Sequence, residues 1–331
     1  MSFSYEDLNQ SLYYGSKFPD GLFASFHARW SPHFYKMILE IIRFNKTVPR
    51  FLKDSTRHSQ TLGEFLKSQN YSEYFKNHYL FATAAAIWSC PDTEIENYPA
   101  KNFFEFFKNH GLLSFFDKPQ WHTVTEGSHI YLKAFSKNFS GKIFLNAPVQ
   151  TIIRRFDQIE IKLKEKSHFF DQVVVATHAD EALKLLSDPS ADEKKYLGAW
   201  RYSQNKTVLH KDDQVMPRNQ KIWSSWNYQR QKNDQKQLTM TYWMNRLQNL
   251  KTNQNYFVTL NPSRLDESKI LEIKDFTHPI YDLHSVAAQK EIQKINGAQR
   301  TFYAGAYLGN GFHEDGVNSA LAVASKLGVR F

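Results

Sequence analysis

The chain has 331 residues, enough for two domains, and its hydrophobic fraction of 41% predicts a globular protein with a packed core. A single cysteine, Cys90, excludes an internal disulfide and fits a reducing compartment, so we expect a cytoplasmic protein. The formal net charge of +9 is scattered along the chain without a nucleic-acid-binding motif. We therefore expect no nucleic acid partner, while a peripheral contact with an anionic membrane surface stays open. The longest apolar run, residues 79–88, is too short to span a bilayer, which takes about 20 residues.

Helical signals dominate the sequence as far as about residue 118. Ser31 and Pro32 form a strong helix start, with serine as the N-cap and proline at the first helical position. Pro49 is expected to end or kink this helix. Further helices are predicted from the capping box Thr61–Glu64, at 71–88, and at 101–110, where Gly111 stops the last one.

Strand signals take over after Trp121. Short stretches with alternating hydrophobicity come first, and a second group of strand candidates is rich in aromatic residues. The predicted strands are 142–147, 150–154, 159–163 and 168–177, then, after a helix at 180–186, 207–210, 222–228, 238–244 and 256–260. A helix at 284–295 leads into the last strand.

The last 31 residues carry the most informative pattern. The apolar run Phe302–Ala304 predicts a strand, four glycines then interrupt any regular period, and apolar residues recur at helical spacing from Val317 onward. We expect Asp315 to be the N-cap of this helix and Gly328 to end it. A strand that passes through glycines to a helix N-terminus suits an anionic ligand, because the first amides of a helix have no acceptor within it.

This tail, with the phrase GAYLGNGFHEDGVNSALAVA, resembles the C-terminal FAD-binding motif of flavin-containing amine oxidases and their relatives, and most of all a bacterial branch of FAD-dependent amine-oxidase-like proteins. The resemblance continues upstream in PQWHTVTEGS, VVVATHAD, SSWNY, TYWMNRLQ and FVTLNP, and so covers nearly the whole chain. In one place the chain departs from the family, because Ala306 stands where an acidic residue usually meets the flavin ribityl chain.

Flavoproteins of this type begin with a βαβ unit whose G-x-G-x-x-G loop seats the FAD pyrophosphate. None of the 13 glycines here has that spacing; Gly309 and Gly311 come nearest, but Glu314 stands in the third position. We therefore expect Met1 to be an internal methionine, with a further N-terminal segment or a partner chain supplying the unit. A natural protein that never had the unit is the alternative. By resemblance, the strand 301–304 should pair with the first strand of that unit, and without it should leave an apolar edge unpaired.

The fold class implied is α/β, an α+β mosaic in which an incomplete Rossmann-like FAD-binding domain alternates with a substrate domain of helices and antiparallel sheet. The expected boundaries are 1–120 for the helical part of the substrate domain, 121–187 for an FAD-binding segment, 188–296 for the sheet part of the substrate domain and 297–331 for the second FAD-binding segment.

By resemblance, the FAD-contacting residues lie in three stretches of the chain. They are Val149, Ala176, Thr177, Gly305, Ala306, Tyr307, Gly311, Phe312, His313, Glu314, Asp315, Gly316 and Val317. Backbone amides of Gly316 and Val317 would stabilise negative charge on the reduced flavin. Aromatic residues would align the substrate, and the candidates are Trp88, Trp226, Tyr242, Trp243 and Tyr307.

The function implied is FAD-dependent oxidation or desaturation, with hydride transfer from an apolar, lipid-like or polyene substrate, or from an amine, to flavin N5. The alternative is a non-catalytic fragment or module that needs a partner chain to complete the FAD site. A metal site is not expected, because the consecutive residues His313, Glu314 and Asp315 would not point at one ion. The sequence identifies no catalytic base.

Overall fold

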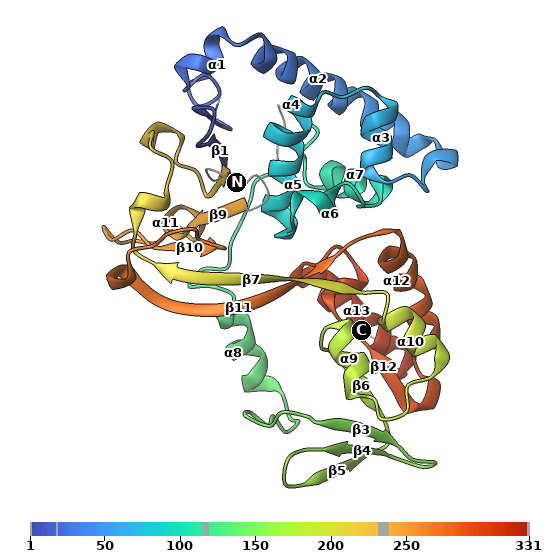
Figure 1. Ribbon diagram of the computed structural model, residues 1–331. Helices are drawn as coiled ribbons and strands as arrows, with labels where there is room; N and C mark the ends of the chain where they lie inside the picture. Colours follow the sequence, from blue (N-terminus) through green and yellow to red (C-terminus); the bar gives the residue numbers. More distant parts are fainter. Residues whose placement is uncertain (1, 18, 115–118, 231–237, 330–331) are drawn as a thin grey trace. The chain divides into compact units, whose positions relative to one another are not determined.

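The computed structural model describes residues 2–17, 19–114, 119–230 and 238–329 (Figure 1). It divides into two compact units, each built from two segments of the chain. Unit 1 comprises residues 1–139 and 203–278, and unit 2 comprises residues 140–202 and 279–331. These divisions do not coincide with the expected boundaries after residues 120, 187 and 296. The assignment of FAD-binding and substrate roles to the segments stays a prediction.

The helices of unit 1 bury a cluster of aromatic rings. Phe44 lies 5.6 Å from Phe104 and 5.7 Å from Phe75, between ring centroids, and all three side chains are fully buried. The predicted helix starts are confirmed, because the side chain of Ser31 accepts from the amide of Phe34 and Thr61 forms the capping box. The helices are α1 (Phe26–Trp30), α2 (Pro32–Lys53), α3 (Leu62–Ser68), α4 (Glu73–Phe75), a π-helix (Lys76–Leu80), α5 (Phe81–Trp88), α6 (Asp92–Ile95), α7 (Ala100–Asn109), α8 (His129–Asn138) and α11 (Met244–Leu247).

In the described part of unit 1 the strands form one sheet, in the order β11-β7-β10-β9-β8-β1-β2. Neighbours β7, β10, β9 and β8 pair antiparallel, whereas β1 lies parallel to β8. The strands are β1 (Phe3–Asp7), β2 (Leu12–Gly15), β7 (Arg201–His210), β8 (Trp226–Arg230), β9 (Leu238–Trp243), β10 (Phe257–Leu260) and β11 (Ile270–Ile280). The aromatic-rich segments therefore form an antiparallel sheet, as the resemblance implies.

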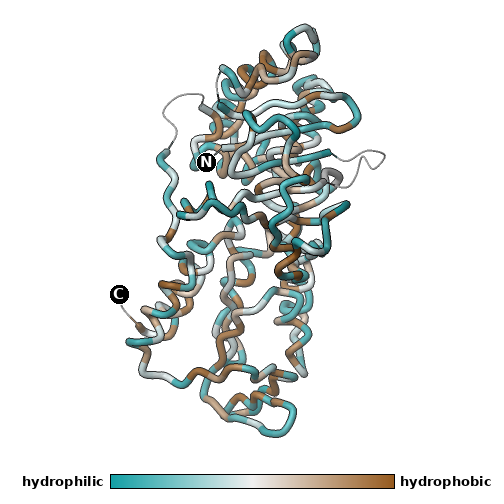
Figure 2. Tube along the Cα trace, turned by 90° about the vertical axis from the view of Figure 1, so that its left-hand side faces the viewer, coloured by the Kyte–Doolittle hydropathy of each residue, from teal (hydrophilic) through white to brown (hydrophobic). Residues whose placement is uncertain are grey.

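Unit 2 contains two separate small sheets among its described residues. The parallel pair β12-β6 carries helices on its flanks, and β3, β4 and β5 form an antiparallel sheet of their own. The strands are β3 (Thr151–Arg154), β4 (Ile159–Lys162), β5 (Ser167–Phe170), β6 (Val173–Val175) and β12 (Thr301–Tyr303). The helices are α9 (Ala179–Leu185), α10 (Ala191–Leu197), α12 (Leu283–Ile295) and α13 (His313–Lys326). Hydropathy colouring shows hydrophobic stretches interrupted by hydrophilic turns in both units (Figure 2).

Several predicted elements are wrong. Residues 142–147 form no strand, since they are almost all exposed and pair with no strand of the described part of the chain. The predicted strand 168–177 is two strands, because β5 pairs with β4 whereas β6 pairs with β12. Of the two alternatives for Pro49, an end of the helix is excluded, because α2 continues to Lys53 with Val48 and Phe51 buried on its core face. The hairpin β1–β2 lies in a region expected to be helical. Among the described residues, no helix is both long and apolar enough to cross a membrane.

Candidate functional site

The tail and the segment around Thr177 meet in unit 2. Strands β6 and β12 run parallel, with Tyr303 opposite Val175, so their carboxyl ends lie side by side at the same end of the sheet. In open α/β sheets ligands bind at this end. The loop after β6 holds Ala176 and Thr177, and after β12 the chain passes through Gly305 into a 3-10 helix (Ala306–Leu308). The structure thus brings together residues that lie more than 120 positions apart in the sequence and that the resemblance assigned to one cofactor.

Gly305 stands where no side chain fits. A Cβ at this position would lie 2.6 Å from the ring of Tyr307 and 3.6 Å from the carbonyl oxygen of Thr177. The amide of Gly305 donates to Ser319 Oγ over 2.9 Å, and that hydroxyl donates in turn to the carbonyl of Gly316 over 2.7 Å. The glycine loop is therefore tied directly to the first turns of α13.

Helix α13 begins at His313, with Phe312 as the N-cap, so the expected start at Asp315 is wrong. The carboxylate of Asp315 instead accepts from the amide of Phe312 over 3.0 Å, from a position inside the first turn. The amide of Gly316 already donates to the carbonyl of Phe312 over 3.2 Å. The amide of Gly316 is thus used within the helix, and the flavin contact expected of Gly316 and Val317 stays a prediction.

The chemistry of this helix end discriminates between ligand groups. Glu314 and Asp315 place two carboxylates in the first turn, where they interact with the positive end of the helix dipole and partly neutralise it. A pyrophosphate would be repelled here, whereas a neutral polar ring edge could accept from the amides. The first turn of α13 is therefore a poor seat for a phosphate group.

The remaining expected FAD contacts also lie in unit 2. Val149 precedes β3 and is 36% exposed, and Ala176 and Thr177 are exposed. Tyr307 is instead buried, with its ring 5.2 Å from that of Trp200 at an angle of 71°. Around the helix start, Gly311, Phe312 and His313 are exposed. Their contact with a cofactor stays a prediction.

The four aromatic residues of unit 1 expected around the substrate do not form one wall. Trp226 and Tyr242 pair across β8 and β9 with their rings 5.6 Å apart, whereas Trp243 follows on the opposite face of β9. Trp88 is buried among aromatic residues of the helical layer, 4.7 Å from Tyr98 and 4.8 Å from Phe106. Trp88 is thus part of the hydrophobic core. Its predicted contact with a substrate stays a prediction, which this packing does not favour.

A cavity of about 700 Å³ in unit 1 was missed by the sequence analysis. Its lining includes Arg218, Arg264, Gln229 and Asp212, which come from separate loops and strands, so no local motif signals it. None of the four aromatic candidates lines this cavity. No group of acidic, histidine or cysteine side chains within the described residues is arranged to hold a metal ion.

A buried polar network at the π-helix was also missed. His78 Nδ1 lies 2.7 Å from the hydroxyl of Tyr5 and 3.7 Å from a carboxylate oxygen of Asp7. Burial lowers the pKa of His78 to about 4, with Asp7 opposing the shift and Arg230 adding to it. His78 lies more than 70 positions from Tyr5 and Asp7 in the sequence, and a π-helix, which often marks a functional site, has no simple sequence signature.

No family model matches the chain, and no curated protein matches it. Several solved structures are similar to it. A CLA-producing fatty acid isomerase from P. acnes has a TM-score of 0.64 and 12% sequence identity, and the match covers 99% of this chain and 80% of that one. Cyclohexylamine oxidase from Brevibacterium oxydans has a TM-score of 0.61 and 10% identity, over 99% and 81%. Putrescine oxidase bound to putrescine has a TM-score of 0.63 and 10% identity, over 99% and 81%. At these identities the likeness concerns the fold alone, and in its fold the chain is similar to these enzymes.

Proposed function

We propose that the chain forms the larger part of an FAD-dependent oxidoreductase of the amine-oxidase type. The observation that carries the proposal is that the segments after β6 and β12 meet at the carboxyl ends of these parallel strands, where a Cβ on Gly305 would lie 3.6 Å from the carbonyl oxygen of Thr177. The fold, similar to that of two amine oxidases and a fatty acid isomerase, supports the same kind of function.

In this proposal the first turn of α13 holds the edge of the flavin ring. The amides of Glu314 and Asp315 would donate to it, because the side chain of Phe312 makes no capping hydrogen bond. When bound, the flavin would accept a hydride from the substrate. The two carboxylates of the first turn would repel a phosphate group, so that only the ring end of the cofactor would bind here. An apolar or an amine substrate remains part of the proposal, as does a peripheral contact with an anionic membrane.

In this proposal the rest of the cofactor is held by a further group, because the sequence contains no G-x-G-x-x-G loop to seat the pyrophosphate. Parallel sheets are normally covered on both faces, yet the parallel pair in unit 2 leaves Val174 of β6 43% exposed. Val317 and Leu321 of α13 are also exposed, at 51% and 40%. We propose that a further segment, in the same protein or in a partner chain, covers these apolar groups and seats the pyrophosphate. The similar structures leave room for it, since the chain spans about four fifths of their length.

Gly316 offers the sharpest test. A Cβ on Gly316 would meet nothing closer than the amide nitrogen of Ala306 at 3.9 Å, so Gly316→Ala should fold normally. A methyl group there would instead obstruct a ring held at the first turn. We expect Gly316→Ala to weaken FAD binding at least tenfold, measured by quenching of flavin fluorescence during titration of the purified chain. Asn318→Ala, at an exposed position of the same helix, is the matched control and should bind FAD like the wild type.

Two results would count against the proposal. Equal FAD affinity in both variants would mean that the ring is not held at this helix. Failure of the wild-type chain to bind either FAD or riboflavin would also count against it, because a ring site without a pyrophosphate seat should still bind the ring of riboflavin.

A further inference from the structure

The junction of α1 and α2 in unit 1 presents large apolar side chains to solvent. Trp30, the last residue of α1, is 77% exposed, and Leu39 in the first half of α2 is 66% exposed. Tyr35 and Ile42 are exposed on the same face of α2, because they lie four residues before and three residues after Leu39. The hydroxyl of Tyr35 donates to the carbonyl of Arg29 over 3.0 Å, which places the end of α1 beside this face (Figure 1). We call the exposed apolar residues Phe26, Trp30, Tyr35, Leu39 and Ile42 the α1–α2 patch.

The exposed charged residues of segment 26–53 are all basic. Glu40, the acidic residue of this segment, is buried and accepts from the amide of Ser72 over 2.9 Å. Arg43 lies 3.6 Å from the carboxylate of Glu40, whereas the other basic side chains of the segment form no ion pair within the described part of the chain. The exposed basic residues are Arg29, Lys36, Arg43, Lys46, Arg50 and Lys53.

One face of α2 is therefore apolar in its first half and basic in its second half. Lys46, Arg50 and Lys53 follow Leu39 at intervals of seven, four and three residues, which keeps them on the same face of the helix. Helices that lie in the plane of a membrane surface combine these features, because their apolar part enters the headgroup region and their Lys and Arg side chains pair with anionic lipids. Tryptophan is itself favoured at such interfaces, since its ring is apolar and its N–H group is polar.

Other occupants fit this surface less well. A second copy of the chain, related by a two-fold axis, would bring the same basic residues of both copies together. A nucleic acid would pair with the basic residues but would leave Trp30 and Leu39 in water. An anionic lipid surface accommodates both the apolar and the basic part.

We propose that the α1–α2 patch docks on an anionic membrane, with Trp30 and Leu39 entering the headgroup region and with Lys46 and Arg50 pairing with lipid headgroups. The proposal defines the surface for the peripheral membrane contact included in the proposed function, and it rests on that function in this respect alone. Apolar burial and charge contribute together to contacts of this kind. Each basic residue near an anionic leaflet strengthens binding about fivefold.

Sedimentation with lipid vesicles tests the docking. We expect the wild-type chain to bind vesicles of equimolar phosphatidylcholine and phosphatidylserine, and to bind vesicles of phosphatidylcholine alone at least tenfold more weakly. Added sodium chloride should weaken binding to the anionic vesicles, since salt screens exposed charges. Failure to bind the anionic vesicles, or equal binding to both kinds, would overturn the proposal.

The apolar contribution is tested by a double variant, Trp30→Ala with Leu39→Ala. Both side chains are exposed, so the variant should fold like the wild type, and we expect it to bind the anionic vesicles at least tenfold more weakly. The matched control is Leu271→Ala with Ile273→Ala, which removes two side chains of β11 that are exposed at 45% and 47% and should leave vesicle binding unchanged. Equal binding by the two double variants would contradict insertion of the patch.

The charge contribution is tested by Lys46→Gln with Arg50→Gln, which should also bind the anionic vesicles at least tenfold more weakly. Lys221→Gln with Lys251→Gln lowers the net charge by the same amount at exposed sites outside segment 26–53 and should bind like the wild type. An equal loss in both double variants would show that binding follows the net charge of the whole chain, against the proposal.

Quenching of tryptophan fluorescence by brominated phosphatidylcholine in the anionic vesicles reports whether Trp30 reaches the lipid. Trp30→Phe keeps an aromatic ring, so it should still bind the vesicles but lose most of the quenching seen in the wild type. Unchanged quenching in Trp30→Phe would place this side chain in water and overturn the proposal.

The other occupants predict different results. Binding that needs Lys46 and Arg50 but not Trp30 and Leu39 would identify a polyanion such as nucleic acid as the partner. Self-association in sedimentation velocity that Leu39→Ala abolishes, without vesicle binding, would identify a second copy. Either result would overturn the proposal. None of these measurements involves flavin, so a failure of FAD binding would count against the proposed function alone.

Discussion

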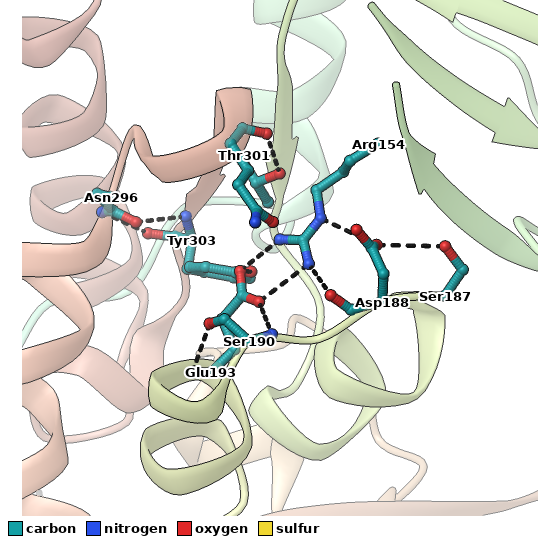
Figure 3. Close-up of polar contacts among 9 residues, drawn as sticks. Arg154, Ser187, Asp188, Ser190, Glu193, Asn296, Thr301 and Tyr303 are labelled. Atoms are coloured by element: carbon teal, nitrogen blue, oxygen red, sulfur yellow. Dashed lines mark hydrogen bonds and ion pairs between the residues drawn. The ribbon is translucent and has the colours of Figure 1, made fainter. Parts of the chain in front are cut away.

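The hydroxyl of Tyr303 donates a hydrogen bond of 2.6 Å to Glu193, 110 positions earlier in the chain. Both residues are buried, and the same carboxylate receives Arg154 at 2.6 Å (Figure 3). The contact joins β12 to α10, and Arg154 extends it to β3 and to Asp188. The side chain of Tyr303 in β12 is thus anchored to the buried ion pair of Glu193 and Arg154. The side-chain amide of Asn296 forms hydrogen bonds with both backbone groups of the same tyrosine.

Arg154→Ala should destabilise unit 2 strongly. It would leave the carboxylate of Glu193 buried without its cation, which typically costs about 3–5 kcal/mol. Urea unfolding followed by circular dichroism would measure the loss. Arg155→Ala is the matched control, since Arg155 pairs with Glu160 from an exposed position, and such pairs contribute little. Equal stability in the two variants would contradict the role assigned to Arg154.

Tyr303→Phe should cost about 1–2 kcal/mol, because one oxygen of a buried carboxylate loses a donor while Arg154 remains. It should also change the response to acid. Burial raises the pKa of Glu193, but the hydrogen bonds from Arg154 and Tyr303 outweigh it and hold the pKa below 4.5. A carboxyl with a lowered pKa in the folded state stabilises the protein above pH 4.5, and that stability is lost as the pH falls through the folded pKa. Unfolding midpoints between pH 3 and 5 should therefore fall less steeply in Tyr303→Phe than in the wild type.

His78 should make the protein less stable as the pH falls from about 6.5 to about 4. Burial lowers its pKa from 6.5 to about 4, so in this window the unfolded chain binds a proton that the folded chain does not. The effect reaches about 3 kcal/mol at most. Burial also lowers the pKa of His210, which adds to the same trend. His78→Gln should flatten the dependence of the unfolding free energy on pH, and His33→Gln, at an exposed site, should not. An unchanged slope in His78→Gln would show that folding does not shift the pKa of His78.

Gly305→Ala should disrupt the loop after β12. The new methyl group would lie within 2.8 Å of two atoms of the Tyr307 ring, which packs against Trp200 and cannot retreat freely. Overpacking of this kind costs about 1–3 kcal/mol. Thermal unfolding should show the loss, and Gly305→Ala combined with Tyr307→Ala should recover part of it. Without such recovery, the clash with Tyr307 would not be the cause.

Local signals in the sequence predicted single elements well. Ser31 with Pro32, the capping box at Thr61 and the turn at Gly111 depend on neighbours within four residues, and each is found as expected. Strand pairing could not be predicted in this way. The apolar run at 168–177 does not indicate that its first half pairs with β4 and its second half with β12. The start of α13 was misplaced for a similar reason, since an aspartate serves both as an N-cap and as an acceptor from inside the first turn.

The sequence by itself determined that glycines interrupt regular structure in the tail and that the chain ends in a helix. Both features depend on short-range sterics and hydrogen bonding. Only the tertiary structure decided that Thr177 lies beside Gly305, that Glu193 lies under Tyr303, and that the side-chain amide of Asn296 forms hydrogen bonds with the backbone of Tyr303. These pairs form where distant segments pack together, and packing depends on the whole set of buried side chains rather than on any spacing along the chain.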